Sequence, residues 1–400
     1  MADSQPLRIL LVGLGTSEVT FLKRLVEGLA GQGVHITISS SRQEVIKGFP
    51  QDKVDWLWAP NWHGPVILRL LRILFMAINA FPLKRRSWLK RLLRNEKSAR
   101  DKLAAIYRYL PFARGHCDVI YFPWNSTAIG YIGLFDLGIP VVLSCRGSQV
   151  NIKPHLEGQE RYVALLKQTF ERAAAVHCVS EDILANAVAL GLNPDKAVVI
   201  RPAVDPTRFS PPIDYPQNDP IRLITTGSLI WRKGYEYLLM ALRQLKDKGL
   251  TAELQIIGEG KDRDRILFTS QDLGIFDQVI LRGNLPPVEV INCLRQADIF
   301  VLSSLSEGIS NAVLEAMSCG LPVVTTDCGG MREAIRDGVE GFVVPVRDPE
   351  ALAEALQKLA LDANLRKQMG QVGRERVIAQ FDAQSQIESF ITMFTKCQGQ

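Results

Sequence analysis

Short apolar runs alternate with longer stretches in which apolar residues recur at helical spacing. In the first half of the chain, the runs predict strands at 8–12, 34–39, 55–58, 118–122, 141–144 and 176–179. Strands that alternate with helices are typical of parallel sheets, because each crossover must return the chain to the same edge. The first half therefore predicts a doubly wound α/β domain.

A second alternation follows a segment that fits neither a helix nor a central strand. This segment, 201–220, contains six prolines and shows no periodicity. Strands are then predicted at 221–225, 254–257, 279–281, 299–302, 322–325 and 341–344. We expect two facing doubly wound domains, with bounds of 1–203 for the first domain, 204–220 for a linker, 221–380 for the second domain and 381–400 for a final helix that crosses back to the first.

Ligands of such sheets bind beyond the carboxyl ends of the strands. Four loops follow strands in this way, at 13–17, 145–151, 227–234 and 304–311. Two sheets that face each other would place all four loops around one cleft.

The last of these loops carries the strongest chemical signal, SEGISNAVLEAM. A helix that starts after Glu307 would offer unpaired amides near Gly308, Ile309 and Ser310 to a diphosphate. Glu307 could accept hydrogen bonds from sugar hydroxyls, and Glu315 could bind a ribose diol. The alternative is an acidic helix start and a solvated helix position, but the apolar residues around Glu315 predict burial, where an acid needs a partner. The motif indicates a nucleotide-sugar donor site.

Two cations lie on the loop that opens the second domain. In TTGSLIWRKGYEYLL a strand ends at Thr226 and a helix begins near Tyr235, which places Arg232 and Lys233 on the connection. Cleavage of a nucleotide sugar leaves negative charge on the departing diphosphate, which fixed cations stabilise. Exposed cations on loops are common, so the two cations indicate a diphosphate site only in combination with the acidic motif described above.

The first strand is followed by the glycines Gly13 and Gly15, as in dinucleotide-binding proteins. However, Glu18 replaces the third glycine, and the second strand ends in HITISS without the acid that binds an NAD ribose. A nicotinamide cofactor is not expected. We interpret Gly13, Gly15 and Thr16 as acceptor-binding, the alternative being a tight turn that requires glycine.

Composition limits the class of protein. Four hundred residues with 47% apolar content suffice for two cores. The seven cysteines lack C-x-x-C spacing, and neither a signal peptide nor a transmembrane stretch is recognised, so a cytoplasmic protein is expected.

The net charge of +5 is unevenly distributed. Between residues 60 and 114, thirteen Lys or Arg side chains face only two acids, Glu96 and Asp101. Apolar residues recur there at helical spacing, and Arg86, Lys90, Arg94 and Lys97 are predicted on one face of a following helix. This basic amphipathic pair predicts peripheral attachment to an anionic membrane surface on its inner face, or capture of an anionic acceptor; the alternative is a solvated helix face. Nucleic acid is not an expected partner, because no reader motif accompanies the charge.

At this point the chain resembles the retaining glycosyltransferases of family four (glycosyltransferase group 1), whose superfamily includes sucrose and glycogen synthases. The resemblance extends over nearly the full length, and its segments are the glycine loop, Lys233–Gly234, IIGEG at 256–260, LRGNLPPVEV at 281–290, ADIFVLSSLSEGISNAVLEAM at 297–317 and DGVEGFVVP at 337–345. It implies the two-domain Rossmann-like architecture called GT-B, with the donor held mainly by the second domain.

The resemblance also implies roles for individual residues. Lys233 would bind the donor diphosphate, Glu307 the transferred sugar, and Glu315 the ribose. The expected catalytic group is therefore Arg232, Lys233 and Glu307. The remaining donor-binding residues are expected to be Gly227, Ser228, Gly258, Gly283, Asn284, Leu285, Gly308, Ile309, Ser310, Asn311 and Glu315.

The chain departs from the family pattern at two places. The usual glycine-arginine pair reads Gly227-Ser228, and we hypothesise that Arg232 supplies the missing charge. Where many relatives have a histidine, this chain has Arg146, Gly147 and Ser148, which we assign to acceptor binding. No general base is assigned; the resemblance implies that the leaving phosphate could accept the acceptor's proton.

No metal and no cofactor are expected beyond the nucleotide sugar as co-substrate. The Asp-x-Asp at Asp262 and Asp264 falls at a predicted helix start, where acids favour the dipole. We therefore expect a metal-independent, retaining hexosyltransferase-type enzyme that moves a sugar to a glycan or lipid-linked acceptor in polysaccharide biosynthesis. The alternatives are an epimerase or phosphorylase of the same architecture, and a non-catalytic nucleotide-sugar-binding module.

Overall fold

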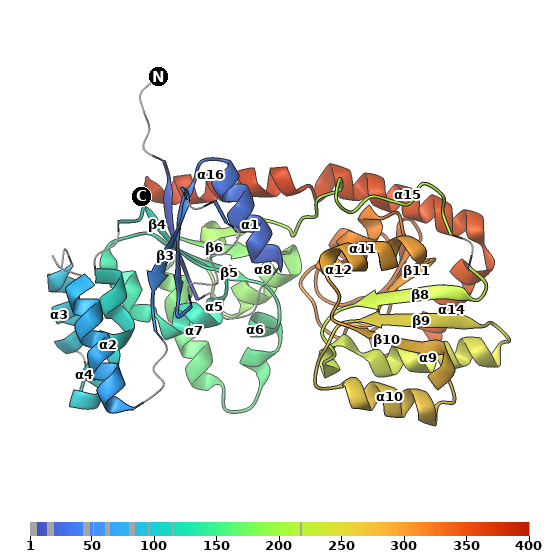
Figure 1. Cartoon of the computed structure of the whole chain (residues 1–400), viewed down its shortest axis with the longest axis horizontal. Coiled ribbons are helices and arrows are strands. Elements are labelled where there is room, and N and C mark those ends of the chain that lie inside the picture. The colour runs from blue at the N-terminus through green and yellow to red at the C-terminus, as the bar shows by residue number, and fades with distance from the viewer. Residues whose placement is uncertain are drawn as a thin grey trace, which may run out of the picture.

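The structure is a computed structural model that describes residues 6–13, 20–42, 49–50, 52–60, 65–79, 85–94, 96–113, 116–216 and 218–399. Two α/β halves lie side by side, and two C-terminal helices run across both (Figure 1). The predicted fold class, two facing doubly wound domains with a C-terminal helix that crosses back to the first, is confirmed.

The first half is built on a parallel sheet. Within the described residues it has seven strands in the order β3-β2-β1-β4-β5-β6-β7, and the order reverses between β1 and β4. The carboxyl ends of these two strands therefore flank a crevice. The strands are β1 (Arg8–Val12), β2 (His35–Ser40), β3 (Val54–Trp58), β4 (Val119–Phe122), β5 (Val141–Cys145), β6 (Ala175–Cys178) and β7 (Ala197–Val199).

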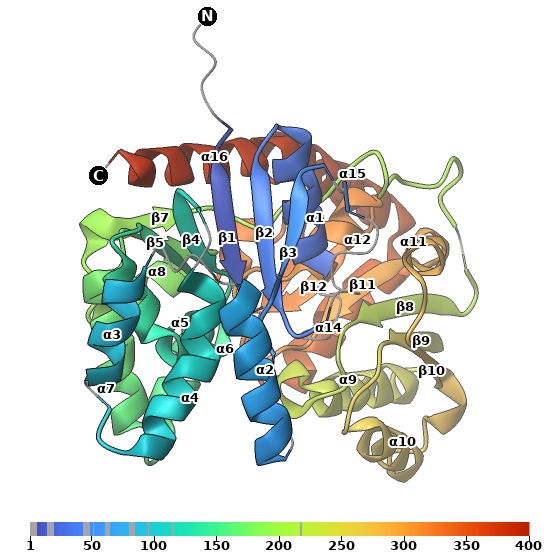
Figure 2. The same cartoon turned by 60° about the vertical axis from the view of Figure 1, so that its left-hand side comes forward.

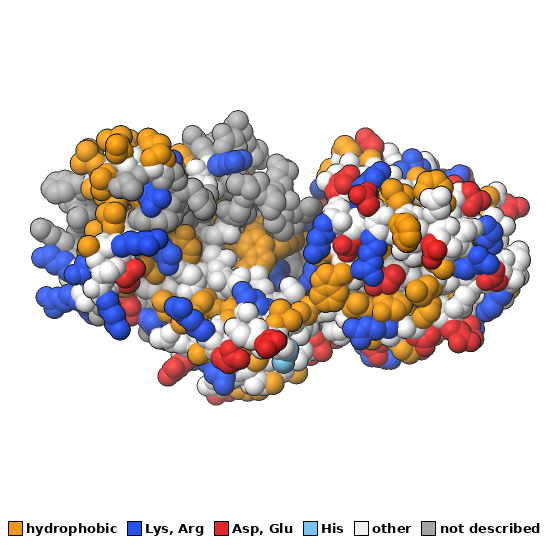
Figure 3. Space-filling view, turned by 90° about the horizontal axis from the view of Figure 1, so that it is seen from below, with side chains coloured by type: hydrophobic (Ala, Val, Ile, Leu, Met, Phe, Trp, Pro, Cys, Tyr) orange, Lys and Arg blue, Asp and Glu red, His pale blue; other side chains and the backbone are white. Residues whose placement is uncertain are grey.

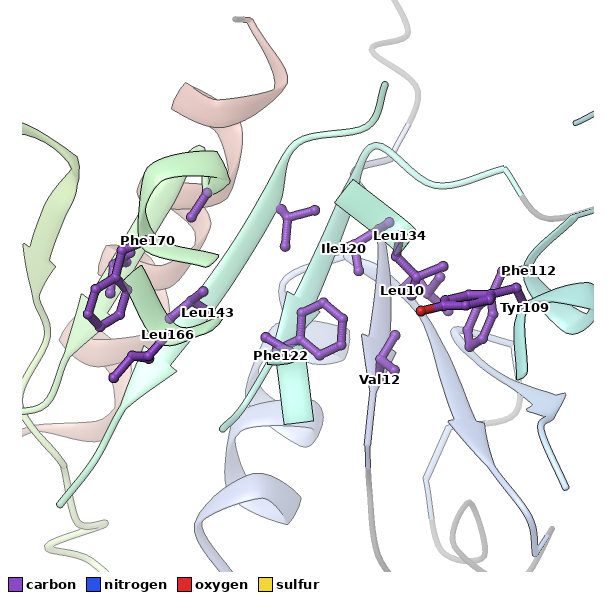
Figure 4. Packing of buried hydrophobic residues seen from close by; sticks show 14 of the residues in the cluster. Leu10, Val12, Tyr109, Phe112, Ile120, Phe122, Leu134, Leu143, Leu166 and Phe170 are labelled. Carbon is purple, nitrogen blue, oxygen red and sulfur yellow. The ribbon is translucent and has the colours of Figure 1, made fainter. Parts of the chain in front are cut away.

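Helices cover both faces of this sheet. They are α1 (Thr20–Gly31), α2 (Val66–Asn79), α3 (Arg86–Arg94), α4 (Ala99–Tyr109), α5 (Asn125–Gly130), α6 (Ser148–Asn151), α7 (Glu160–Arg172) and α8 (Glu181–Ala189). Leu10 and Val12 point into one core with Phe122 and Phe170 (Figure 4), whereas Ile9 and Leu11 belong to the core on the opposite face. Alternation along β1 thus supplies both cores, as expected of a strand covered on both faces.

The second half repeats the plan with strands β8 to β13. In the described chain its sheet has the order β10-β9-β8-β11-β12-β13, all parallel. The strands are β8 (Ile221–Thr226), β9 (Ala252–Ile257), β10 (Val279–Gly283), β11 (Ile299–Leu302), β12 (Val323–Thr326) and β13 (Gly341–Val344). The helices are α9 (Tyr235–Asp247), α10 (Arg263–Asp272), α11 (Pro287–Gln296), α12 (Asn311–Ser318), α13 (Met331–Ala334), α14 (Pro349–Leu361), α15 (Ala363–Gln380) and α16 (Ala383–Gln398).

The last two helices connect the halves. α15 packs on α12 of the second half, and α16 packs on α1 and β4 of the first. Phe390 and Phe394 of α16 lie buried with their ring centroids 6.1 and 5.3 Å from the ring of Tyr121. The buried aromatic contact explains why the chain's end returns to the first domain.

The basic segment differs from its prediction in one respect. α3 ends at Arg94, so Lys97 lies on the connection to α4 instead of on the predicted helix face. Both Lys97 and Arg94 are exposed in the same region, and α2 stands in front of the first half (Figure 2). No described helix combines the length and the apolar content needed to cross a bilayer.

Candidate active site

A cleft of about 560 Å³ separates the two halves. The surface is visibly hollowed between them when the molecule is viewed from below (Figure 3). Residues of both halves line the cleft: Phe21, Arg24, Trp124, Arg146, Val179, Pro202, Thr226, Gly227, Ser228, Arg232, Lys233, Glu307, Gly308, Ile309, Ser310, Asn311, Ala312 and Glu315. Three of the four predicted loops thus contribute to one site.

A buried ion pair joins the two sequence motifs of the second domain. Lys233 ends the short 3₁₀ turn Trp231–Lys233, and its Nζ lies 2.6 Å from Oε1 of Glu307. The same carboxylate oxygen accepts a hydrogen bond of 2.9 Å from the Ser304 hydroxyl. Burial by itself would raise the pKa of Glu307, but the charge and hydrogen bond of Lys233, with help from Ser304, lower it below its usual value. Glu307 is therefore held as an anion by these two contacts.

The start of α12 lies beside this pair. α12 begins at Asn311, slightly later than the motif suggested, and Ser310 occupies its N-cap without a side-chain capping bond. In the described part of the chain, the amides of residues 308–313 donate no hydrogen bond. Unpaired amides at the positive end of a helix dipole suit a diphosphate.

The two domains touch where Gly308 meets Arg146. A Cβ atom at Gly308 would lie 2.7 Å from the Arg146 carbonyl oxygen and 2.7 Å from Cγ2 of Val179. Only glycine allows the first domain to approach the loop before α12 this closely. The loop after β5 therefore stands directly opposite the amides.

The Arg146 side chain is fixed by a chain of hydrogen bonds. Its guanidinium donates to the Pro123 carbonyl at 3.0 Å and to the Tyr121 hydroxyl at 3.2 Å, and lies 3.9 Å from the ring centroid of Phe21. Beyond Tyr121, hydrogen bonds continue to Ser144 at 2.8 Å and from Ser144 to Nδ1 of His177 at 2.7 Å.

His177 determines which group donates and which accepts in each of these hydrogen bonds. Its Nε2 contacts the Ile200 carbonyl at 2.8 Å, and a carbonyl can only accept. Burial, followed by the charge of Arg146, lowers the pKa of His177 to about 3, so the ring is neutral and Nδ1 accepts from Ser144. The Tyr121 hydroxyl then donates to Ser144 and accepts from Arg146. His177 thus orients Arg146 through Ser144 and Tyr121, and both of its ring nitrogens are engaged in hydrogen bonds within the protein.

Glu315 is paired across the cleft. Nη2 of Arg24, on α1, lies 2.6 Å from its Oε1, and both side chains are largely buried. Burial raises the pKa of Glu315 above its usual value, although Arg24 and then Arg208 oppose this. The carboxylate predicted for the ribose thus takes its counter-charge from the other domain.

The remaining predicted residues are only partly brought together. Gly258 lies beside Gly227 behind the cleft, and Gly283, Asn284 and Leu285 lie at and after the end of β10, outside the cleft lining. Gly147 and Ser148 begin α6, also outside the lining, and Gly13 lies against Thr127. Gly15 and Thr16 fall outside the described residues.

Several residues of the site were not predicted from the sequence. Phe21, Arg24 and Trp124 line the cleft, and Ser304 hydrogen-bonds to Glu307. The spacing of three residues between Ser304 and Glu307 is a local signal that could have identified Ser304. Arg24 has no such signal, because its partner is 291 residues away. The described residues contain no group of three or more His, Cys, Asp or Glu side chains that could hold a metal ion.

Profiles of two known protein families match the sequence. The sequence profile described as “Glycosyltransferase Family 4” matches residues 19–208, and the profile described as “Glycosyl transferases group 1” matches residues 210–376. Together the two profiles cover most of the chain.

Curated relatives match over part of their length. The chain is 32% identical over 231 residues to the “Putative colanic acid biosynthesis glycosyltransferase WcaL” of Escherichia coli, covering 56% of this chain and 57% of that protein. It is 34% identical over 179 residues to the “Amylovoran biosynthesis glycosyltransferase AmsK” of Erwinia amylovora, covering 43% of this chain and 44% of that protein. The chain thus spans about half the length of the curated relatives that it matches.

Solved structures match over the whole chain. A glycosyltransferase from Rickettsia africae superimposes with a TM-score of 0.72 at 16% identity, covering 98% of this chain and 99% of that chain. Anabaena Alr3699/HepE in complex with UDP-glucose has a TM-score of 0.71 at 15% identity, covering 96% and 99%. At such identities the likeness establishes the fold alone.

Proposed function

Because the chain belongs to the glycosyltransferases of group 1 and family 4 and has their GT-B fold, we propose that it transfers a sugar from a nucleotide-diphosphate sugar to a glycan or lipid-linked acceptor. The observation that carries the proposal is the buried Lys233–Glu307 pair beside the unpaired amides of residues 308–313. A cation, an anion and free amides within one cleft fit the diphosphate and hydroxyls of an activated sugar.

The donor would lie along the second domain. Its diphosphate would contact the amides before and within the first turn of α12, together with Lys233 and Arg232, and Glu307 would accept from the sugar hydroxyls. The backbone at 283–285 would contact the base. With two cations and a helix start supplying positive charge, the departing diphosphate needs no metal ion in this proposal.

We further propose transfer with retention of anomeric configuration. The bond from the anomeric carbon to the diphosphate oxygen breaks, a bond to the acceptor oxygen forms on the same face, and the acceptor's proton passes to the departing phosphate oxygen. This route needs no protein base, which agrees with the neutral, internally bonded His177. Arg146 and the loop after β5 would face the acceptor from the first domain.

The acceptor class is supported by two relatives whose names state colanic acid and amylovoran biosynthesis. By analogy, we propose that this chain acts in polysaccharide biosynthesis. A hexose as the transferred sugar is part of the same proposal, which is supported by the UDP-glucose bound to Alr3699/HepE.

A thermal-shift panel tests donor binding. UDP, GDP, ADP and their sugars are compared, and at 100 times its dissociation constant a ligand stabilises the native state by about 2.7 kcal/mol. We expect one nucleotide series to raise the melting temperature by several degrees.

Product analysis separates the alternatives: incubation with donor alone should release little nucleotide if the enzyme is a transferase, whereas an epimerase would interconvert donor sugars without any acceptor. Binding without turnover across an acceptor panel would indicate a binding module.

We also propose that α2 attaches the enzyme peripherally to an anionic membrane on the cytoplasmic side. Ile67, Leu71, Leu74 and Ile78 recur at helical spacing and keep 57 to 72% of their surface exposed. Exposed lysines and arginines lie on α3, on the connection after it and on α4, which packs on α2; they are Lys90, Arg91, Arg94, Lys97, Arg100 and Lys102. Figure 3 shows apolar side chains gathered near basic ones on this half of the molecule. An apolar helix face with basic neighbours fits a lipid surface, where a lipid-linked acceptor would be found.

Removing the apolar face should release the protein from vesicles. The double variant Leu71→Asp/Leu74→Asp should reduce partition onto phosphatidylglycerol vesicles at least about tenfold, since two anchors are replaced by repelled charges. Both side chains are exposed, so the melting temperature should change little. Leu361→Asp, at an exposed leucine of the second domain, is the matched control. Equal partition of the unmodified protein onto neutral and anionic vesicles at low salt would rule out the electrostatic part.

A further inference from the structure

Arg24 stands between two cavities of the interdomain space. It lines the donor cleft and also a second cavity of about 270 Å³, formed with α16 and the linker. Its side chain is held by Glu315 and, through Nη1, by the Ala203 carbonyl at 3.4 Å. Its guanidinium carbon also lies 5.9 Å from the ring centroid of Phe209. Arg24 thus contacts the second domain, the linker and the cleft at once.

The geometry leaves part of this ion pair unused. Arg24 engages only Oε1 of Glu315, and within the described residues Oε2 accepts no hydrogen bond. The Nε atom of Arg24 is buried and has no partner. A carboxylate with one oxygen held by a cation and the other directed to a cleft can accept hydroxyl groups without losing its counter-charge.

We propose that Arg24 is a positioning residue for the nucleotide: from the first domain it orients and compensates the Glu315 carboxylate, so that a ribose diol is recognised only when the domains are closed. This inference rests on the proposed function, which places the ribose at Glu315. Beyond the proposed function, the inference states that the ribose site of the second domain is incomplete without α1 of the first domain. Nucleotide recognition is thereby coupled to closure of the cleft.

The electrostatic surroundings explain the need for Arg24. Glu315 is faced by Arg24 on α1 and by Arg208 on the linker, while Cys319, directly after the end of α12, stays neutral because burial raises its pKa to about 12. The pKa of Glu315 is already raised by burial with Arg24 in place. Without Arg24 it should rise further, so the ionised form that accepts both hydroxyls would be lost at a higher pH.

The test compares ribose with 2′,3′-dideoxyribose nucleotides. Affinities for UDP, GDP and ADP and for their dideoxy forms are measured by calorimetry. In the unmodified protein we expect the ribose form of the bound nucleotide to bind at least about tenfold more tightly. In Arg24→Gln the ratio of the ribose affinity to the dideoxyribose affinity should fall toward one, while the affinity for the dideoxyribose nucleotide stays that of the unmodified protein. Arg24→Lys should restore part of it, and Lys23→Gln, an exposed position on the same helix, should change nothing.

Two further measurements separate positioning from general damage. In a Glu315→Gln background, Arg24→Gln should cause no additional loss of ribose preference, because both changes act on the same contact. Any residual ribose preference of Arg24→Gln should also disappear at a higher pH on acidification than the preference of the unmodified protein. An unchanged ribose preference in Arg24→Gln, or an equal loss for both nucleotide forms, would overturn the inference while leaving the proposed function intact. If none of the three nucleotides binds the unmodified protein, both fail.

Discussion

Replacing Lys233 with alanine is expected to reduce the transfer rate by about a hundredfold to a thousandfold, which is typical for removal of one preorganised group that stabilises developing charge. Lys233 is both a cation of the cleft lining and the partner of Glu307, with its Nζ 2.6 Å from Oε1 of that residue. Its loss would leave a buried carboxylate without a counter-ion, so the pKa of Glu307 should rise from its lowered value. We expect kcat to fall more than the affinity for the nucleotide, measured with steady-state kinetics and calorimetry.

The neighbouring cations provide the controls for this prediction. Lys261→Ala removes an exposed lysine from the loop after β9 and should leave kcat unchanged. Arg232→Ala should also reduce kcat, because Arg232 lines the cleft and is proposed to replace the arginine missing at Ser228. Near-normal turnover in Arg232→Ala, with turnover lost in Lys233→Ala, would refute that replacement. Normal turnover in Lys233→Ala would remove the basis of the proposed mechanism.

The Gly258→Ala variant is expected to lose about 3 kcal/mol or more of folding free energy, because strain and a backbone clash add together. Gly258 has a φ of 142°, and an added Cβ would lie 1.9 Å from the Gly227 carbonyl oxygen. The clashing atom belongs to the backbone, which cannot rotate away as the end of a flexible side chain can. The loop that contains Gly227 would therefore have to move. Since Gly227 lines the cleft, we expect nucleotide affinity to fall together with the urea midpoint.

Gly249→Ala separates the two contributions to this effect. Gly249 also has a positive φ, 78°, but an added Cβ would meet no atom within 4 Å. It should lose only about 1 to 2 kcal/mol, the cost of the backbone conformation alone. Equal losses in the two variants would show that the contact with Gly227 does not matter.

The sequence by itself determined the architecture. All strands of both sheets except the edge strand β7 could be predicted within a few residues, because apolar runs between helical stretches report local burial, which needs no knowledge of distant contacts. The expected donor motif could also be recognised in the sequence. Its residues Glu307, Lys233 and Glu315 belong to short segments in which a loop, a helix start and an acid follow one another along the chain. Local order along the chain was therefore sufficient to select three residues that line one cleft.

Only the tertiary structure decided which residues complete the site. Arg24, the counter-ion of Glu315, comes from a helix 291 positions earlier, and the hydrogen-bond chain from Arg146 to His177 joins three separate strands and their loops. Gly308 likewise shows its role only through contact with Arg146. A sequence pattern reports neighbours along the chain, whereas counter-charges and close approaches depend on how two independently built sheets are placed against each other.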